Sequence, residues 1–217
     1  WPDTGKLKVK AHYRAGQLHG LVEQYYPSGA LQLKHPYAEH RLHGEALDYF
    51  ENGQLKSSVH FEHGVQSGPF KLFSADGKLL EEGVLKEGVR HGPFTLYSPE
   101  TGQPVRQGTY QLNELDGEVI TWRPDGLKVV GTYEKGLAHG WQKIYNAQGA
   151  LLGEIKMQNG RATGVFHVFD AKGRIVQEGS HGKTADELFR IITSPRPQTN
   201  DPTPEENGGI VIKEIFE

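Results

Sequence analysis

The stretch Gly88-Val89-Arg90-His91-Gly92-Pro93-Phe94-Thr95-Leu96-Tyr97 decides how this chain folds, because its pattern recurs along most of the sequence. Its central glycine, Gly92, belongs to a column of seven glycines separated by steps of 24, 24, 24, 25, 23 and 24 residues. These repeat glycines are Gly20, Gly44, Gly68, Gly92, Gly117, Gly140 and Gly164. Such regular spacing is typical of repeat architectures, whose periods are about 20–50 residues.

Other columns keep the same register. A second glycine follows each repeat glycine by nine residues, or by ten in the fourth repeat, and histidine precedes four of the seven. An apolar or aromatic residue, from Tyr13 to Met157, stands seven positions before each repeat glycine. An aromatic residue follows by five positions: Tyr25, Tyr49, Phe73, Tyr97, Trp122, Tyr145 and Phe169.

Each unit has the sequence of a β-hairpin. Residues 92–97 form a six-residue run that is rich in β-branched and aromatic side chains, as strands are. Turns such as 51–53 and 62–64 end in a glycine, which supplies the positive φ that a hairpin turn requires. We therefore predict an all-β fold, an elongated solenoid-like meander of about seven hairpin repeats of roughly 24 residues. A single hairpin is marginal in water, so the repeats must stack on one another.

Alternation along each strand separates two faces. We expect the aromatic column to lie on one face and to form the core row. Residues two and four after the repeat glycine point the other way, and they vary: Phe70 and Leu72 in one repeat correspond to Ala46 and Asp48 in another. That second face is predicted to be partly exposed and different in each repeat.

The repeat ends near Gly182, which divides the chain into an array over 1–182 and a C-terminal segment over 183–217. Thr184 and Glu187 form a capping-box pattern, which predicts a short amphipathic helix over 184–193 that covers the open edge of the last hairpin. Residues 194–209 are rich in Pro, Asn, Asp and Gly and read as a linker. Residues 210–216 read as a strand that either folds back onto the array, the reading we favour, or docks on a partner by strand addition.

Composition excludes several classes of function. The net charge is −3 without a basic stripe, which argues against nucleic acid as a partner. No run approaches about 18 apolar residues, so no integral membrane segment is predicted, although weak association with a membrane surface stays open. There is no cysteine, hence no disulfide and no thiolate metal site.

Catalytic and metal motifs are also lacking. There is no Gly-x-Ser-x-Gly elbow and no phosphate-binding loop. The pairs His40-x-x-His43 and His60-x-x-His63 have a spacing that does not place both rings on one face of a strand. We predict no catalytic residues, no cofactor and no metal, and therefore a binding protein rather than an enzyme.

Candidates for partner contact are large aromatic side chains and an arginine that lie beside the aromatic column or depart from the repeat pattern. These residue types dominate the energetics of protein interfaces. For each tryptophan, packing between neighbouring hairpins is the competing reading, and it is favoured for Trp122 because that residue belongs to the aromatic column. The candidates are Trp141, Trp122, Tyr26, Phe50 and Arg123.

The combination of a Gly-x-x-His-Gly turn, an aromatic strand and a second glycine turn resembles the MORN repeat in its second, bacterial variant. Residues 16–20, 88–92 and 136–140 carry the turn best, and 25–31 and 49–55 resemble the aromatic half. The resemblance covers roughly residues 5–182. Departures are His40 and Asn113 in place of turn glycines, and Ser67, Asp116 and Thr163 in place of the histidine.

The resemblance implies binding. Bacterial proteins of this variant are often described as antitoxin-like or as immunity proteins, so it implies a cognate toxin or effector protein that the chain neutralises by occluding it. The alternative implied by the better-known eukaryotic arrays is a membrane- or lipid-associated scaffold. A fold alone does not choose between them.

The expected location is the periplasm or another exported compartment, with the cytoplasm as the alternative. The sequence begins at Trp1 and its one methionine is Met157, as it would after removal of a signal peptide or after trimming of a lipid-anchored precursor. For an exported chain, the expected partner is a membrane-attacking effector of a secretion system, such as a lipase.

Overall fold

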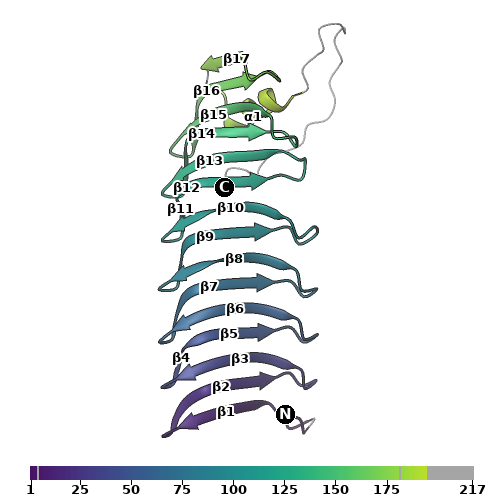
Figure 1. The fold of residues 1–217 in the computed structure, drawn as a ribbon, viewed down its shortest axis with the longest axis vertical. Helices are drawn as coiled ribbons and strands as arrows, with labels where there is room; N and C mark the ends of the chain where they lie inside the picture. The colour runs from purple at the N-terminus through teal and green to yellow at the C-terminus, as the bar shows by residue number, and fades with distance from the viewer. Residues whose placement is uncertain (4, 181, 195–217) are drawn as a thin grey trace. The chain divides into compact units, whose positions relative to one another are not determined.

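The computed structural model describes residues 1–3, 5–180 and 182–194. Within them the chain forms 17 strands and one α-helix, and paired strands run antiparallel (Figure 1). The chain divides into two compact units, residues 1–114 and 115–217, and each is described by itself. The short strand β11 (Glu114–Leu115) lies at the boundary. The predicted all-β meander of hairpin repeats is confirmed.

Unit 1 is an open antiparallel sheet in which the strands pair in chain order, from β1 with β2 to β9 with β10. The two-residue strand β4 also pairs with β3, which continues onto β5. The strands are β1 (Val9–Arg14), β2 (Gln17–Tyr25), β3 (Leu31–Ala38), β4 (Arg41–Leu42), β5 (Gly44–Tyr49), β6 (Leu55–Glu62), β7 (Val65–Phe73), β8 (Leu79–Lys86), β9 (Val89–Tyr97) and β10 (Pro104–Gln111).

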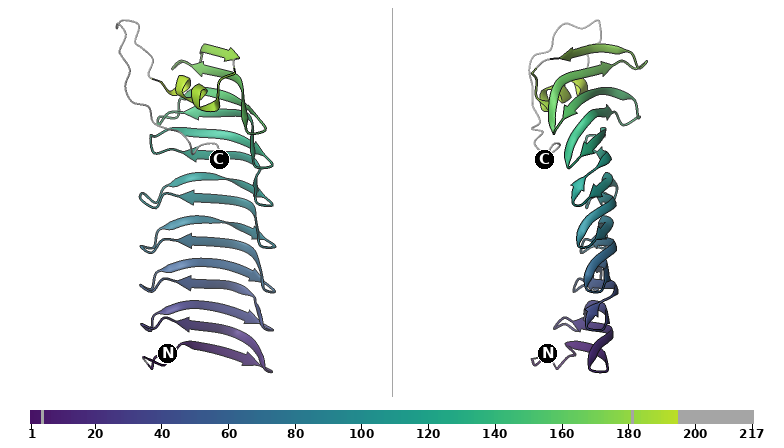
Figure 2. Two further views of the ribbon diagram at one scale, coloured as in Figure 1. Left: turned by 180° about the vertical axis from the view of Figure 1, so that it is seen from behind. Right: turned by 90° about the vertical axis from the view of Figure 1, so that its left-hand side faces the viewer.

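Unit 2 continues the same pattern and adds the helix. Its strands pair in chain order from β12 to β17. Figure 2 shows α1 on one side of this sheet. The elements are β12 (Gly117–Trp122), β13 (Lys128–Glu134), β14 (Leu137–Tyr145), β15 (Leu151–Gln158), β16 (Arg161–Phe169), β17 (Ile175–Ser180) and α1 (Ala185–Thr193).

Strands β5 and β12 begin at their repeat glycine as predicted, but the other strands that contain a repeat glycine start earlier. The strand expected to begin at Gly68 begins at Val65, and Gly68 lies inside it with φ +116°. Opposite this point the pairing register between β6 and β7 shifts, which is a β-bulge. Two residues that replace turn glycines, His40 and Asn113, still adopt φ values of +64° and +70°. The turn conformation of the repeat therefore persists where its glycine is lost.

Gly68→Ala should lower the free energy of unfolding by about 2 kcal/mol, because its φ strains any side chain and the new Cβ would lie 3.1 Å from His60 Cβ. Gly102→Ala is the matched control. Its φ is +70° with no atom within 4 Å of the added Cβ, so a loss of about 1 kcal/mol is expected. Urea denaturation of both variants measures the difference, and equal losses would contradict it.

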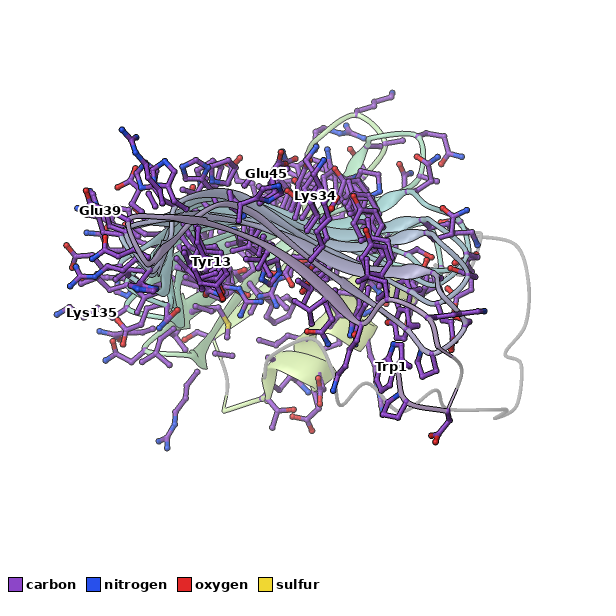
Figure 3. All side chains as sticks on the ribbon, turned by 90° about the horizontal axis from the view of Figure 1, so that it is seen from below. Trp1, Tyr13, Lys34, Glu39, Glu45 and Lys135 are labelled. Carbon is purple, nitrogen blue, oxygen red and sulfur yellow. The ribbon has the colours of Figure 1, made fainter. Side chains whose placement is uncertain are left out.

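Pairing between strands defines two faces of each sheet. Phe70 pairs with Val59 and Gly83, and Leu72 pairs with Ser57. We call this side of the sheet face A. In every repeat it carries the residues two and four positions after the repeat glycine and seven, nine and eleven positions before it. Face B carries the alternating positions. Figure 3 shows the separation in unit 1, with Tyr13 on one side of the sheet and Lys34 and Glu45 on the other.

The core row lies on face A, not in the aromatic column. The position two residues after the repeat glycine is buried in the second to seventh repeats: Ala46, Phe70, Phe94, Val119, Gln142 and Phe166. The aromatic column is only half-buried throughout. Tyr25 and Tyr97 of that column reach Glu23 and Glu82, which are residues of face B. The predicted core row was therefore wrong.

Glycines on face A explain this burial. The ring of Phe70 lies over Gly83, where an added Cβ would be 2.8 Å from Phe70 Cε1. The ring of Phe166 lies over Gly179 in the same way, with 2.6 Å to its Cε1. A phenylalanine on one strand thus fills the space that a glycine leaves on the next. A sequence pattern based on large residues alone does not reveal this pairing of a phenylalanine with a glycine on the next strand.

Helix α1 is confirmed with its capping box. The Glu187 N–H donates to Thr184 Oγ1 at 3.3 Å, and the Thr184 N–H donates to Glu187 Oε2 at 2.7 Å. The helix packs on face A of β15 and β16, so its predicted position along the open edge was wrong. It joins one hydrophobic cluster with the sheet: Val129, Ala138, Ile144, Ile155, Met157, Phe166, Val168, Leu188, Phe189 and Ile192.

The division at residue 182 stays a prediction. The linker, apart from Ser194, and the strand predicted over 210–216 lie outside the described residues.

Candidate partner-binding surface

Face A of unit 1 carries exposed apolar side chains beside its buried row. No helix of the described residues in unit 1 covers it. Leu72, four residues after its repeat glycine, is 36% exposed, whereas Val168 at the same position in unit 2 is 2% exposed beneath α1. Tyr13 is also exposed, although its counterpart Met157 is buried. The same columns are therefore a core in unit 2 and a surface in unit 1.

A shallow hollow marks the middle of this face. It has a volume of about 250 Å³ and includes Val59, Phe70, Leu72 and Leu85 in its lining. Arg90 forms its rim, with its guanidinium 6.0 Å from the centre of the Phe70 ring. Arg90 Nη2 also contacts Glu81 Oε1 at 2.7 Å, so its charge is paired. The hollow offers apolar contact beside a cation whose charge is already balanced.

A polar group lies on the same face. His35 Nε2 is 2.8 Å from Asp48 Oδ1, and Ser57 Oγ donates to Asp48 Oδ2 at 3.0 Å. The hydrogen bond with His35, with a smaller contribution from Ser57, holds the pKa of Asp48 below its usual range even though partial burial raises it. The ionised carboxylate is therefore favoured in the folded chain.

This shift predicts an acid dependence of stability. A lowered folded pKa gives stability that is present above the unfolded pKa of about 4 and is lost as the pH falls through the folded value. Asp48→Asn should therefore flatten the decline of the melting temperature below about pH 4. Glu51→Gln, the loss of an exposed carboxyl group, is the control. An unchanged acid decline in Asp48→Asn would contradict the assignment.

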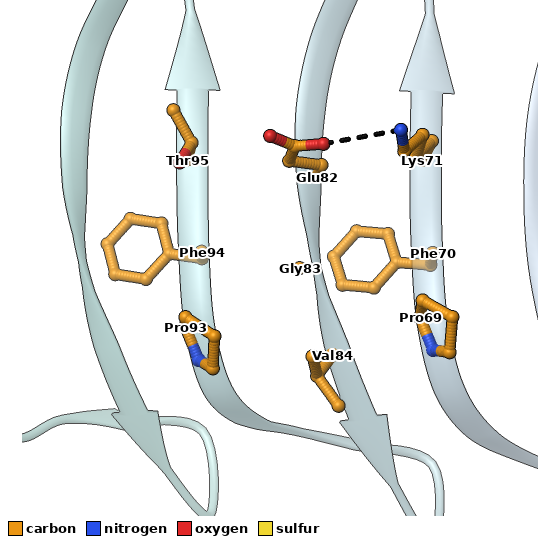
Figure 4. A pocket seen from close by; sticks show the side chains of 9 residues that line it. All are labelled: Pro69, Phe70, Lys71, Glu82, Gly83, Val84, Pro93, Phe94 and Thr95. Carbon is orange, nitrogen blue, oxygen red and sulfur yellow. Dashed lines mark ion pairs between the residues drawn. The ribbon is translucent and has the colours of Figure 1, made fainter.

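A second hollow of unit 1, of about 220 Å³, is formed by β7, β8 and β9 (Figure 4). Its lining combines two phenylalanines, two prolines and a valine with polar and charged residues, and Lys71 Nζ lies 3.5 Å from Glu82 Oε2. Both hollows are smaller than the roughly 300–1,000 Å³ of typical small-molecule sites. They are better matched to single side chains of a partner than to a whole cofactor.

Trp141, one of the predicted contact residues, lies on face B of unit 2. Its ring stacks on His167 at a centroid distance of 4.9 Å, and Lys156 Nζ lies 5.6 Å from its centre. His167 Nδ1 is 2.9 Å from Glu154 Oε1. The tryptophan is half-buried, and both neighbours take up part of its surface.

The other predicted residues have contacts within the fold. Arg123 lies over the ring of Phe189 at 4.9 Å and so helps to hold α1. Tyr26 Oη donates to the carbonyl of Tyr49 in the next repeat at 2.9 Å. Phe50 lies at a turn with Lys56 Nζ 5.8 Å from its ring centre, and Trp122 is half-buried in β12. Two of the five candidates lie in unit 1 and three in unit 2.

The described residues contain no group of three or more His, Asp or Glu side chains placed to hold a metal ion. In the same part of the chain, no helix is both long and apolar enough to cross a membrane.

Comparison with known proteins identifies two of the repeats. The family model described as "MORN repeat variant" matches residues 18–39 and 42–63. Both lie in unit 1, over β2 to β6. No curated protein matches the chain.

Proposed function

Because the chain is a MORN-repeat protein, matched by the variant model in its first and second repeats, we propose that it neutralises a toxic effector protein by occluding it with face A of unit 1. The observation that carries this proposal is the exposure of Leu72 at a position that is core in unit 2. Exposed apolar surface of this kind marks interaction sites. In this reading the chain is exported and meets a membrane-attacking, lipase-type effector in the periplasm.

Charge favours a protein partner over a lipid surface. Binding to anionic membranes draws on clusters of Lys and Arg. The chain has a net charge of −3, and the Arg90 side chain on face A is paired with Glu81. An apolar face with balanced charges is better suited to another protein than to lipid headgroups.

The test uses the product of the gene beside the one for this chain. Co-expression of this chain should restore growth, and the purified chain should inhibit that product's lipase activity in a stoichiometric manner. Leu72→Glu should abolish protection, because a carboxylate would be buried at the interface without a partner. Leu21→Glu is the matched control, since Leu21 is 37% exposed but lies on face B.

Two results would overturn the proposal. One is a neighbouring product whose toxicity and lipase activity are unchanged by the chain. The other is equal loss of protection in both variants together with sedimentation of the chain on phosphatidylglycerol vesicles, which would indicate a membrane scaffold.

A further inference from the structure

We infer that the third repeat binds one amphipathic α-helix of the partner, in the way that the seventh repeat binds α1; this deepens the proposed function and rests on it. The third-repeat site consists of Val59, Phe61, Phe70 and Leu72 on face A of unit 1. The occupant is a helix with apolar side chains spaced like those of α1.

The seventh repeat shows what these columns bind. Ile155, Met157, Phe166 and Val168 occupy the equivalent positions and are buried beneath Leu188, Phe189 and Ile192 of α1. All eight side chains are apolar, and phenylalanine occupies the position two residues after the repeat glycine in both sets. A helix of suitable sequence therefore has the same apolar surface to contact in the third repeat.

The backbone beneath the two sites is also alike. Phe70 lies over Gly83 as Phe166 lies over Gly179. Both phenylalanines are consequently flattened against the sheet, and neither ring stands in the way of a helix. Phe70 is already buried by its neighbours within the sheet. A bound helix would therefore cover mainly Leu72, which is exposed, and Phe61, which is half-buried.

The position eleven residues before the repeat glycine also differs, and it defines the occupant more closely. In unit 2, Ile192 approaches Gly153 so closely that an added Cβ would lie 2.6 Å from Ile192 Cγ2. The third repeat has Ser57 there, which donates to Asp48. We expect the partner helix to carry a small or polar side chain where α1 carries Ile192, beside apolar residues equivalent to Leu188 and Phe189.

A helix fits this surface better than an added strand. The backbone pairing of β6, β7 and β8 is already taken up by neighbours on both sides. Strand addition requires an open edge. An amphipathic helix needs only an apolar sheet face, which is how helices and sheets pack in layered folds.

The probe is a helix-stabilised, fluorescein-labelled peptide with the sequence of residues 184–194, titrated with the full chain by fluorescence anisotropy. Leu72→Glu should weaken binding by about tenfold or more, because the buried leucine contact is lost. Leu21→Glu should leave binding unchanged. Circular dichroism of both variants verifies that the sheet is intact.

A double-mutant cycle tests the register. Ser57→Gly recreates the glycine of the seventh repeat and should strengthen binding of the peptide by about threefold or more. A peptide with Ile192→Ala should lose that gain. The cycle separates the third-repeat site from the α1 site in unit 2, where the peptide could exchange with the resident helix.

The outcomes are distinct from those of the proposed function. No binding, or equal binding by wild type and Leu72→Glu, overturns the helix site even where neutralisation by the chain is observed. If Leu72→Glu weakens peptide binding and Ser57→Gly strengthens it, but the chain neutralises no effector, the helix site is upheld and the proposed function is overturned. Loss of neutralisation in Leu72→Glu with no peptide binding points to a partner surface other than a helix, which also overturns this inference.

Discussion

Leu188→Ala should lower the free energy of unfolding of unit 2 by about 2–5 kcal/mol. Leu188 is 0% exposed and packs in the cluster that α1 shares with the sheet. The cavity left behind cannot be filled easily, because the surrounding residues are held by strand pairing. The loss cannot exceed the free energy of docking α1 onto the sheet, because the helix can detach while the strands remain paired.

Denaturation followed by tryptophan fluorescence measures this change, and amide hydrogen exchange locates it in α1. Arg190→Ala is the control on the same helix, because Arg190 is exposed. If α1 contributes to the core, Leu188→Ala should greatly lower the free energy of unfolding, whereas Arg190→Ala should lower it by less than about 0.5 kcal/mol. Similar small losses in both would show that α1 is not part of the core.

Gly153→Ala should cost about 3 kcal/mol, although it adds a single methyl group. The added Cβ would lie 2.6 Å from the carbonyl oxygen of His167 and 2.6 Å from Ile192 Cγ2. The first neighbour is backbone of the paired strand β16 and cannot move without disturbing the ladder. The substitution therefore strains the sheet and the helix contact together.

Gly83→Ala is the comparison in unit 1. Its added Cβ would meet the Phe70 ring at 2.8 Å, but a side chain on an open face can turn away, so a loss of about 1 kcal/mol is expected. Chemical denaturation ranks the two variants. Adding Ile192→Ala to Gly153→Ala should not restore stability, because the clash with the His167 carbonyl remains. If Ile192→Ala fully restored the stability of Gly153→Ala, the strain would lie in the contact with α1 alone.

Much of the fold could be predicted from the repeat columns. The steps between repeat glycines predict the hairpins, and Thr184 with Glu187 predicts the capped helix. The core row could not be found in that way. A ring such as Phe70 is buried because Gly83 stands beside it on the next strand, and that relation depends on pairing register rather than on position within one repeat.

The candidate site was the harder problem. Residue type predicts Trp141 and Arg123 as contact residues, yet the structure gives them neighbours within unit 2. The sequence places Leu72 on the face predicted to be partly exposed, but it does not single out Leu72 or Leu85 as contact residues. Only the comparison with Val168 shows that Leu72 is uncovered, and that comparison requires knowing where α1 lies. The contact of α1 with the seventh repeat thus shows that the equivalent surface of the third repeat is uncovered.

The separation of columns also bears on how such a protein can change partners over evolutionary time. Glycines and turn residues set the backbone of each repeat, whereas face A positions such as that of Phe70 and Ala46 differ between repeats. Mutations in those positions alter recognition while the scaffold is inherited intact. Duplication or loss of a whole hairpin changes the length of the recognition surface in discrete steps, without a new fold having to arise.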